Sequence, residues 1–151
     1  HELVARGTGA PYVELFESFV QDCRSIDISE KLIHALREMK RDFRIILATG
    51  NTDALERYSI PRRESMFDIF DDIDNSFRIG RMKYDDGGAY FSHRAEQEGI
   101  PMQRAYLLED SEGTCEVFRA LGGTAYLVNS EPTALHALGA IIREMVLENV
   151  S

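Results

Sequence analysis

The sequence contains few of the residues that stabilise small folds through covalent bonds or metal ions. Only Cys23 and Cys115 occur in its 151 residues, which is too few for a disulfide framework or a cysteine zinc site. The four histidines are scattered, without the spacing of a metal-binding motif. We therefore expect two reduced, half-buried cysteines in an intracellular protein whose stability comes from its hydrophobic core.

Long apolar runs and an excess of basic residues are also missing. No apolar stretch approaches the roughly 18 residues of a membrane span, and no signal peptide opens the chain. These absences predict a cytoplasmic protein with no membrane partner. The net charge of −9 argues against nucleic acid, whose phosphates need a basic surface. A small phosphorylated molecule remains a suitable ligand if local cations or a metal ion hold it.

What is present is a regular alternation of helical and strand patterns. A chain of this length with 44% hydrophobic residues is expected to form one ordinary domain. The alternation predicts a parallel sheet covered by helices on both faces. Residues 59–88 are less regular. The final helix has an aliphatic face that is most simply core, with a homodimer surface as the alternative. The expected helices follow Pro11 and Ser29 and cover residues 89–98, 111–121 and 133–148, and the expected strands are residues 43–48, 105–108 and 124–128.

The most informative motif is a short apolar run that ends in two adjacent carboxylates, Glu109 and Asp110, before a small-residue turn and an amphipathic helix. A buried parallel strand presents acids in this way at its carboxyl edge, where open α/β sheets bind ligands. Two neighbouring carboxylates at such an edge favour a hard cation such as Mg²⁺. The alternative is structural, because acids also stabilise a helix N-terminus through its dipole.

Two further segments carry groups suited to phosphate. Thr49 follows the expected strand 43–48, and the N–H groups of Gly50 and Asn51, at the expected start of a helix, can donate to phosphate oxygens. The ammonium group of Lys83 can neutralise a phosphoryl group. Each residue also has a simpler structural interpretation, with Thr49 as a helix cap and Lys83 as a solvated surface lysine.

Together these motifs resemble the haloacid dehalogenase (HAD) superfamily, whose members are mostly Mg²⁺-dependent phosphohydrolases with a Rossmann-like core. Residues 45–51 are similar to the second motif of the family, residues 70–83 to the stretch that leads to its lysine, and residues 106–113 to its fourth motif. The resemblance extends from about Asp27 to Val128. The proline that usually follows the lysine is absent here.

The resemblance implies a fold, a chemistry and a set of site residues. The fold would be a three-layer Rossmann-like core, and the activity would be hydrolysis of a small phosphomonoester through an aspartyl-phosphate. Thr49 and Lys83, with Gly50 and Asn51, would hold the phosphoryl group. Glu109 and Asp110 would bind Mg²⁺.

The sequence departs from the family at its front. Family members open with a buried strand that ends in Asp-x-Asp, whose first aspartate is the nucleophile, and no such motif precedes Thr49 here. Residues 3–8 could be a degraded version, but we favour the interpretation that residues 1–26 are the remainder of a helical cap and residues 27–151 are the core. Asp72 and Asp74 have the required spacing but follow the second motif, so we reject them as the nucleophile loop.

The missing strand has a structural consequence and leaves two classes of function. In the family it lies between the strands that correspond to residues 43–48 and 105–108, so its loss would leave buried backbone groups unpaired at about 1–3 kcal/mol each. The gap could close by re-pairing, another segment could fill it, or the fold could be unstable alone.

Two classes of function follow from the missing motif. The chain is either an incomplete HAD-type phosphatase or a non-catalytic binding or assembly module. A receiver-like signalling domain fits poorly, because its lysine follows its acids.

Overall fold

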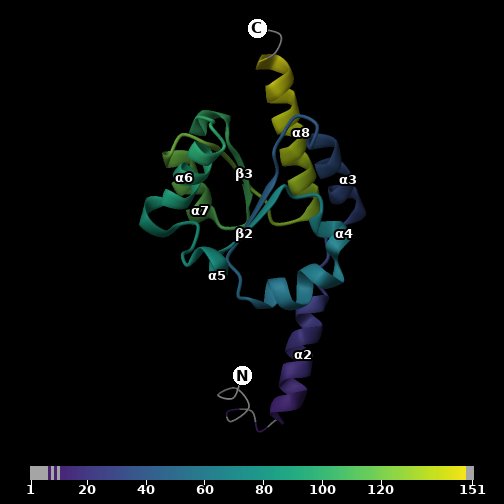
Figure 1. The fold of residues 1–151 in the computed structure, drawn as a ribbon. Helices are drawn as coiled ribbons and strands as arrows, with labels where there is room; N and C mark the ends of the chain where they lie inside the picture. The colour runs from purple at the N-terminus through teal and green to yellow at the C-terminus, as the bar shows by residue number, and fades with distance from the viewer. Residues whose placement is uncertain (1–6, 8, 10, 149–151) are drawn as a thin grey trace.

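The computed structural model describes Gly7, Gly9 and residues 11–148, and it forms an α/β fold in which helices cover two faces of parallel strands (Figure 1). Most of the predicted elements are present with small shifts at their ends. The longer helices are α2 (Tyr12–Arg24), α3 (Glu30–Met39), α6 (Ala89–Gln97), α7 (Glu112–Ala120) and α8 (Glu131–Glu148). The short helices are η1 (Leu55–Ser59), η2 (Ile60–Arg62), α4 (Glu64–Phe67), α5 (Ser76–Ile79), η3 (Asp85–Gly87) and η4 (Met102–Arg104). The strands are β1 (Ile46–Thr49), β2 (Asp72–Asn75), β3 (Tyr106–Glu109) and β4 (Thr124–Leu127).

The strands form two parallel pairs. β1 pairs with β2, in a register that places Thr49 opposite Asn75. β3 pairs with β4, in a register that places Glu109 opposite Leu127. Parallel strands that are joined through helices are expected from the alternating sequence pattern, and this part of the prediction is confirmed.

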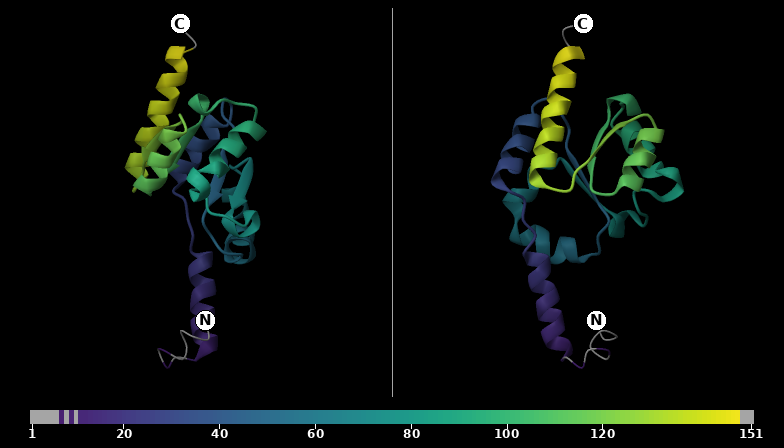
Figure 2. Two further views of the ribbon diagram at one scale, coloured as in Figure 1. Left: turned by 90° about the vertical axis from the view of Figure 1, so that its left-hand side faces the viewer. Right: turned by 180° about the vertical axis from the view of Figure 1, so that it is seen from behind.

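One face of the strands is covered by α3, α4 and α8 (Figure 2). Ser29 caps α3 by accepting the N–H of Leu32 at 3.2 Å, as its sequence position predicts. Ile33 of α3 packs with Phe67 of α4 and with Leu47 of β1. Ile141 of α8 lies in a second cluster, which also contains residues of α3, β3 and β4. This packing makes the first half of α8 part of the core.

The other face is covered by α6 and α7. Phe91 of α6 and Phe118 of α7 meet edge to face, with ring centroids 4.9 Å apart. They pack with the buried Cys115 and with Ala48 of β1 and Leu107 of β3. Burial raises the pKa of the Cys115 thiol. Side chains of β1 and β3 therefore share the apolar cluster on this face.

Although they share this packing, β1 and β3 are not paired with each other. Among the residues that the structure describes, each belongs to a separate two-stranded sheet. All four residues of β1 are only half-buried, whereas interior strands of parallel sheets are normally buried on both faces. Among the described residues, β1 and β3 have therefore not closed the sheet by pairing with each other.

β2 was not predicted, because its sequence is acidic. Asp72 and Asp74 alternate with apolar residues and project toward α6, where Arg94 forms ion pairs with both. Arg44 also binds Asp72, at 2.8 Å, and the Tyr90 hydroxyl donates to Asp74 at 2.7 Å. The two carboxylates of this strand are therefore paired with side chains on segments that lie more than ten residues away in the sequence.

This ion-pair network predicts a contribution of Asp72 to acid stability. Hydrogen bonds from Arg94 and Arg44 hold the pKa of Asp72 below its usual value. Stabilisation by this carboxylate is therefore complete above its unfolded pKa of about 4 and is lost as pH falls through the lower folded pKa. We expect Asp72→Asn to lower the midpoint of urea unfolding at pH 7, and this difference to shrink at pH 3. The exposed Asp42 provides the matched control, Asp42→Asn, for which a similar pH-dependent difference would contradict the assignment.

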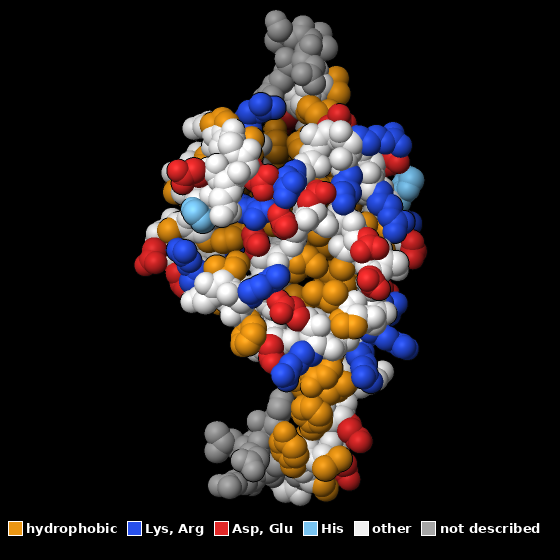
Figure 3. All heavy atoms as spheres, viewed as in Figure 1, with side chains coloured by type: hydrophobic (Ala, Val, Ile, Leu, Met, Phe, Trp, Pro, Cys, Tyr) orange, Lys and Arg blue, Asp and Glu red, His pale blue; other side chains and the backbone are white. Residues whose placement is uncertain are grey.

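α2 stands apart from the two helical layers and carries apolar side chains on its surface (Figure 3). Phe16 and Phe19 both contact the ring of Tyr58 in η1, with centroids 6.4 and 6.5 Å apart. The Ser59 hydroxyl also donates to the Cys23 carbonyl at 2.7 Å. Since η1 follows the carboxyl end of β1, these contacts place α2 on the carboxyl side of the strands.

Across the described part of the chain, none of the helices is both long and apolar enough to cross a membrane.

Candidate functional site

The predicted site residues lie at or just beyond the carboxyl ends of two strands. Thr49 is the last residue of β1, and Glu109 is the last residue of β3. The strand register fixes both positions, because β1 and β3 are each held in line by a parallel neighbour. Open α/β sheets bind ligands at this edge.

Lys83 reaches this edge from the segment between α5 and η3. Its Nζ atom forms an ion pair and a close hydrogen bond with Oε2 of Glu109. Only 19% of the lysine side chain and 5% of the glutamate side chain are exposed, so the pair is largely shielded from water. The backbone N–H of Ser111 donates to the other carboxylate oxygen, Oε1, at 3.1 Å. Two residues that are 26 positions apart in sequence thus form one charged unit.

The segment after β1 lies beside the lysine segment. A Cβ atom added at Gly50 would lie 2.7 Å from Cε of Met82, the residue before Lys83. Only a residue without a side chain fits here while Met82 keeps its position. The loop after β1 and the segment that carries Lys83 are therefore in close contact at Gly50 and Met82.

One local expectation is wrong. Gly50 and Asn51 lie in a loop and not at the start of a helix, because η1 begins only at Leu55. Hydrogen bonds within this loop explain why the helix starts later than expected. Oδ1 of Asn51 accepts the N–H of Thr52 at 2.8 Å, and Oγ1 of Thr52 accepts the N–H of Ala54 at 3.2 Å. Such local bonds favour turns over helix. Thr52, and not Thr49, therefore supports the turn that leads into η1.

The structure also identifies supporting residues that we did not predict. Asn75, at the end of β2, is fully buried and donates through Nδ2 to the Thr52 carbonyl at 3.0 Å. The hydroxyl of Ser76 donates to the Asn51 carbonyl at 3.1 Å. These bonds attach the loop after β1 to the end of β2. The only signal in the sequence was an Asn-Ser pair before an apolar residue, which is typical of a helix cap.

Asp110 differs from Glu109 in its environment, because its side chain is exposed. Residues 7, 9 and 11–148 contain no group of three or more His, Cys, Asp or Glu side chains arranged around one point. Mg²⁺ often binds through one or two carboxylates and keeps several waters, so Glu109 and Asp110 are chemically suitable for it. Glu109 would then share its carboxylate between the metal ion and Lys83.

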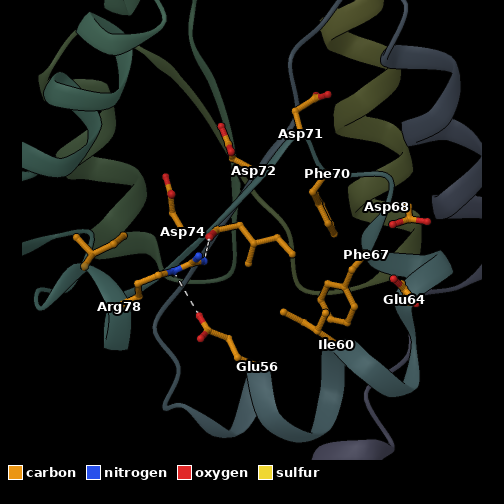
Figure 4. Close-up of a pocket in the computed structure, with 12 residues that line it drawn as sticks. Glu56, Ile60, Glu64, Phe67, Asp68, Phe70, Asp71, Asp72, Asp74 and Arg78 are labelled. Carbon is orange, nitrogen blue, oxygen red and sulfur yellow. Dashed lines mark hydrogen bonds and ion pairs between the residues drawn. The ribbon is translucent and has the colours of Figure 1, made fainter.

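A separate cleft of about 710 Å³ lies between β2 and the short helices η1, η2 and α4, and neither Lys83 nor Glu109 lines it (Figure 4). Its lining is mostly acidic and apolar, and Arg78, the basic group in it, is paired with Glu56 at 3.4 Å. An anionic ligand would be repelled by this excess of carboxylates. The cleft therefore does not provide a second phosphate site.

The sequence matches no protein-family model and no characterised relative. The structure is similar to a predicted HAD-like family hydrolase from Porphyromonas gingivalis, with a TM-score of 0.73 and 15% identity over 94% of this chain and 71% of that one. It is also similar to a HAD family enzyme from Bacteroides thetaiotaomicron in complex with magnesium and inorganic phosphate, with a TM-score of 0.58 and 19% identity. That match covers 70% of this chain and 55% of the enzyme, so the chain spans only about half the length of the Bacteroides protein.

These similarities establish the fold. The chain has a HAD-like α/β core with parallel strands and helices on both faces, as its sequence motifs implied. The division into a helical segment of residues 1–26 and a core of residues 27–151 remains a prediction, as do the roles of the individual site residues.

Proposed function

We propose that this chain carries the phosphate- and magnesium-binding part of a HAD-type phosphohydrolase that acts on a small phosphomonoester in the cytoplasm. The observation that carries the proposal is the shielded pair of Lys83 and Glu109 beside the loop after β1. The Bacteroides neighbour holds magnesium and inorganic phosphate, which supports phosphate chemistry for a site on this fold.

Each site residue has a defined task in this proposal. The ammonium group of Lys83 neutralises the phosphoryl oxygens, and the Thr49 hydroxyl and the N–H groups of Gly50 and Asn51 donate hydrogen bonds to them. Glu109 orients Lys83, and Glu109 and Asp110 supply carboxylate oxygens for Mg²⁺. The metal ion would offset the negative charge that develops during phosphoryl transfer.

The reaction also needs an aspartate nucleophile, which forms a bond to phosphorus while the bond to the leaving oxygen breaks. No Asp-x-Asp motif precedes Thr49, and Asp72 and Asp74 are held by Arg94 and Tyr90. Turnover by this chain would therefore show that one of its own aspartates can serve as the nucleophile, with Asp72 and Asp74 as the first candidates to test.

Hydrolysis of p-nitrophenyl phosphate by the purified chain tests this function. We expect turnover that requires Mg²⁺ and that falls about 100-fold or more in Asp110→Asn, because one metal ligand is lost. The control is Glu116→Gln, which removes an exposed acid from the same helix region and should leave turnover unchanged. Equal loss in both variants, or turnover without Mg²⁺, would contradict the metal assignment.

The second candidate function is a non-catalytic HAD-fold module that binds or assembles. Among the described residues, β1–β2 and β3–β4 form separate two-stranded sheets, and this favours the second candidate because the edges of a small sheet can pair with other segments. Well-folded protein with no turnover, but with Mg²⁺-dependent binding of inorganic phosphate, would select this candidate.

A further inference from the structure

A second pocket, of about 590 Å³, lies where the end of α2 meets η2. The residues that line it are all polar, and three of them are arginines: Gln21, Arg24, Ser25, Arg62 and Arg63. We call this set the arginine pocket. No described acidic residue lines it, although the chain contains 26 aspartates and glutamates against 17 lysines and arginines. The pocket is therefore a region of positive charge on an anionic protein, and basic side chains gather at this end of α2 in Figure 3.

Two short stretches of the chain bring the three guanidinium groups of this pocket together. The lining residues from the end of α2 follow the spacing i, i+3 and i+4 from Gln21, so they lie on one face of the helix. The other two, Arg62 and Arg63, are at the end of η2. Just before η2, the Ser59 hydroxyl donates to the Cys23 carbonyl in the last turn of α2 at 2.7 Å. This hydrogen bond joins the two stretches next to the pocket.

The arginines of the pocket have little neutralising charge around them. Elsewhere in the chain, Arg44 binds two carboxylates, at 2.8 and 2.9 Å. In the part of the chain that the structure describes, the side chains of Arg24 and Arg62 form no ion pair and no hydrogen bond. Arg63 reaches the exposed Asp27 only at 3.9 Å, and an exposed pair of this kind contributes little. The guanidinium groups therefore repel one another when the pocket is empty.

We propose that the arginine pocket is a second anion site, which binds the phosphoryl group of a small phosphorylated molecule or inorganic phosphate itself. Asp27 and the C-terminal end of α2, which carries about −0.5 elementary charge, offset only part of the charge of the three arginines. A phosphoryl group, with a charge of about −1.5 to −2 at pH 7, matches the remainder. The planar fork of each guanidinium group can donate paired hydrogen bonds to phosphoryl oxygens. Because the lining is entirely polar, the ligand is held by its charge and not by an apolar body.

An anion bound in the arginine pocket would also strengthen the attachment of α2. This helix contains no buried residue. A phosphoryl group that binds Arg24 of α2 and Arg62 of η2 together replaces repulsion between like charges with two attractive contacts. Binding should therefore stabilise the packing of α2 on the short helices after β1. The pocket shares no residue with the site at Lys83 and Glu109, so this proposal does not rest on the proposed function.

NMR titration of the full chain with inorganic phosphate, without Mg²⁺ and at constant ionic strength, tests the proposal. We expect saturable shifts of the Nε–H resonances of Arg24 and Arg62, together with slower amide exchange at Val20 in α2. Arg62→Gln should weaken phosphate binding by about 10-fold or more, because hydrogen bonds to a charged group are lost. The matched control is Arg104→Gln, which removes an exposed arginine from η4 and should leave binding unchanged. Titration with glycerol 3-phosphate then shows whether a phosphate ester or the free ion binds more tightly at the same arginines.

Three results would overturn the proposal. The arginine resonances could shift without saturation, which would indicate general screening of charge and not a site. Arg104→Gln could weaken binding as much as Arg62→Gln does. Succinate, a dianion without phosphorus, could bind as tightly as phosphate, which would remove the assignment to a phosphoryl group. Phosphate at the Lys83 site would instead shift the amides of Gly50 and Asn51, so failure of the proposed function and failure of the arginine pocket give different spectra.

Discussion

Replacing Lys83 with Met should lower the free energy of unfolding by about 3 kcal/mol, because it leaves the shielded Glu109 carboxylate without its ammonium partner. Only 5% of the Glu109 side chain is exposed, so water cannot replace the lost interaction without local rearrangement. For a chain of this size the change corresponds to a loss of roughly 10 °C in melting temperature. Urea unfolding of both proteins at pH 7, without divalent cations, measures it directly.

Two further variants distinguish loss of the Lys83–Glu109 ion pair from general disruption of the segment that carries Lys83. Arg81 lies on the same segment but is exposed, so Arg81→Met should change stability by no more than about 0.5 kcal/mol. The double variant Lys83→Met/Glu109→Gln should regain most of the loss, since no unpaired charge remains. If Lys83→Met lowers the free energy of unfolding by less than about 1 kcal/mol, the Glu109 carboxylate must be hydrated or bound by another partner in the variant.

The same variant probes the magnesium assignment without any measurement of activity. In the native protein, Oε2 of Glu109 is engaged by Lys83. Once the ammonium group is gone, Mg²⁺ should bind the freed carboxylate and stabilise Lys83→Met more than it stabilises the native chain. Equal thermal shifts for both proteins on addition of Mg²⁺ would count against Glu109 as a ligand.

Local signals in the sequence predicted much of this fold. The helix α3 was predicted from the cap signal at Ser29, and α7 was predicted from an amphipathic pattern after a small-residue turn; the structure shows that Ser111 caps α7 as well. β3 and β4 were found because they are short apolar runs. The strand β2 was missed because its acids are neutralised by Arg44 and Arg94, which are 28 and 22 residues away from Asp72. Pairing at that distance leaves no local trace in the sequence.

The candidate site was likewise predicted only in part from local sequence signals. The motifs identified Thr49, Lys83 and Glu109 as residues at one edge of the sheet, and the structure brings Lys83 and Glu109 into direct contact. The sequence did not predict that they would bind each other, because a lysine proposed for phosphate and an acid proposed for metal were assigned to different ligands. The resemblance predicted that β1 and β3 are not neighbours in the sheet, and among the described residues the two strands belong to separate sheets.

Gly88→Ala is the second change for which we expect a large effect, because two separate penalties act at this position. Gly88 has a φ angle of +81° and precedes α6, a left-handed conformation that costs a residue with a side chain about 1–2 kcal/mol. An added Cβ would also lie 2.5 Å from Cγ1 of Val117 and 3.1 Å from Cδ1 of Leu121. Overpacking of this kind costs about 1–3 kcal/mol, so we expect a total loss of about 4 kcal/mol in urea unfolding.

A variant of the neighbouring glycine, Gly87, distinguishes the backbone penalty from the steric penalty. Gly87 also has a positive φ angle, +67°, but a Cβ there would meet nothing within 4 Å. Gly87→Ala should therefore carry only the backbone cost of about 1–2 kcal/mol, and the difference between the variants measures the contact of α6 with α7. In the Gly88→Ala background, Val117→Ala should destabilise less than it does alone, because it removes the clashing methyl group. Equal losses for Gly87→Ala and Gly88→Ala would show that α6 shifts freely against α7, contrary to the close packing of Phe91 on Phe118.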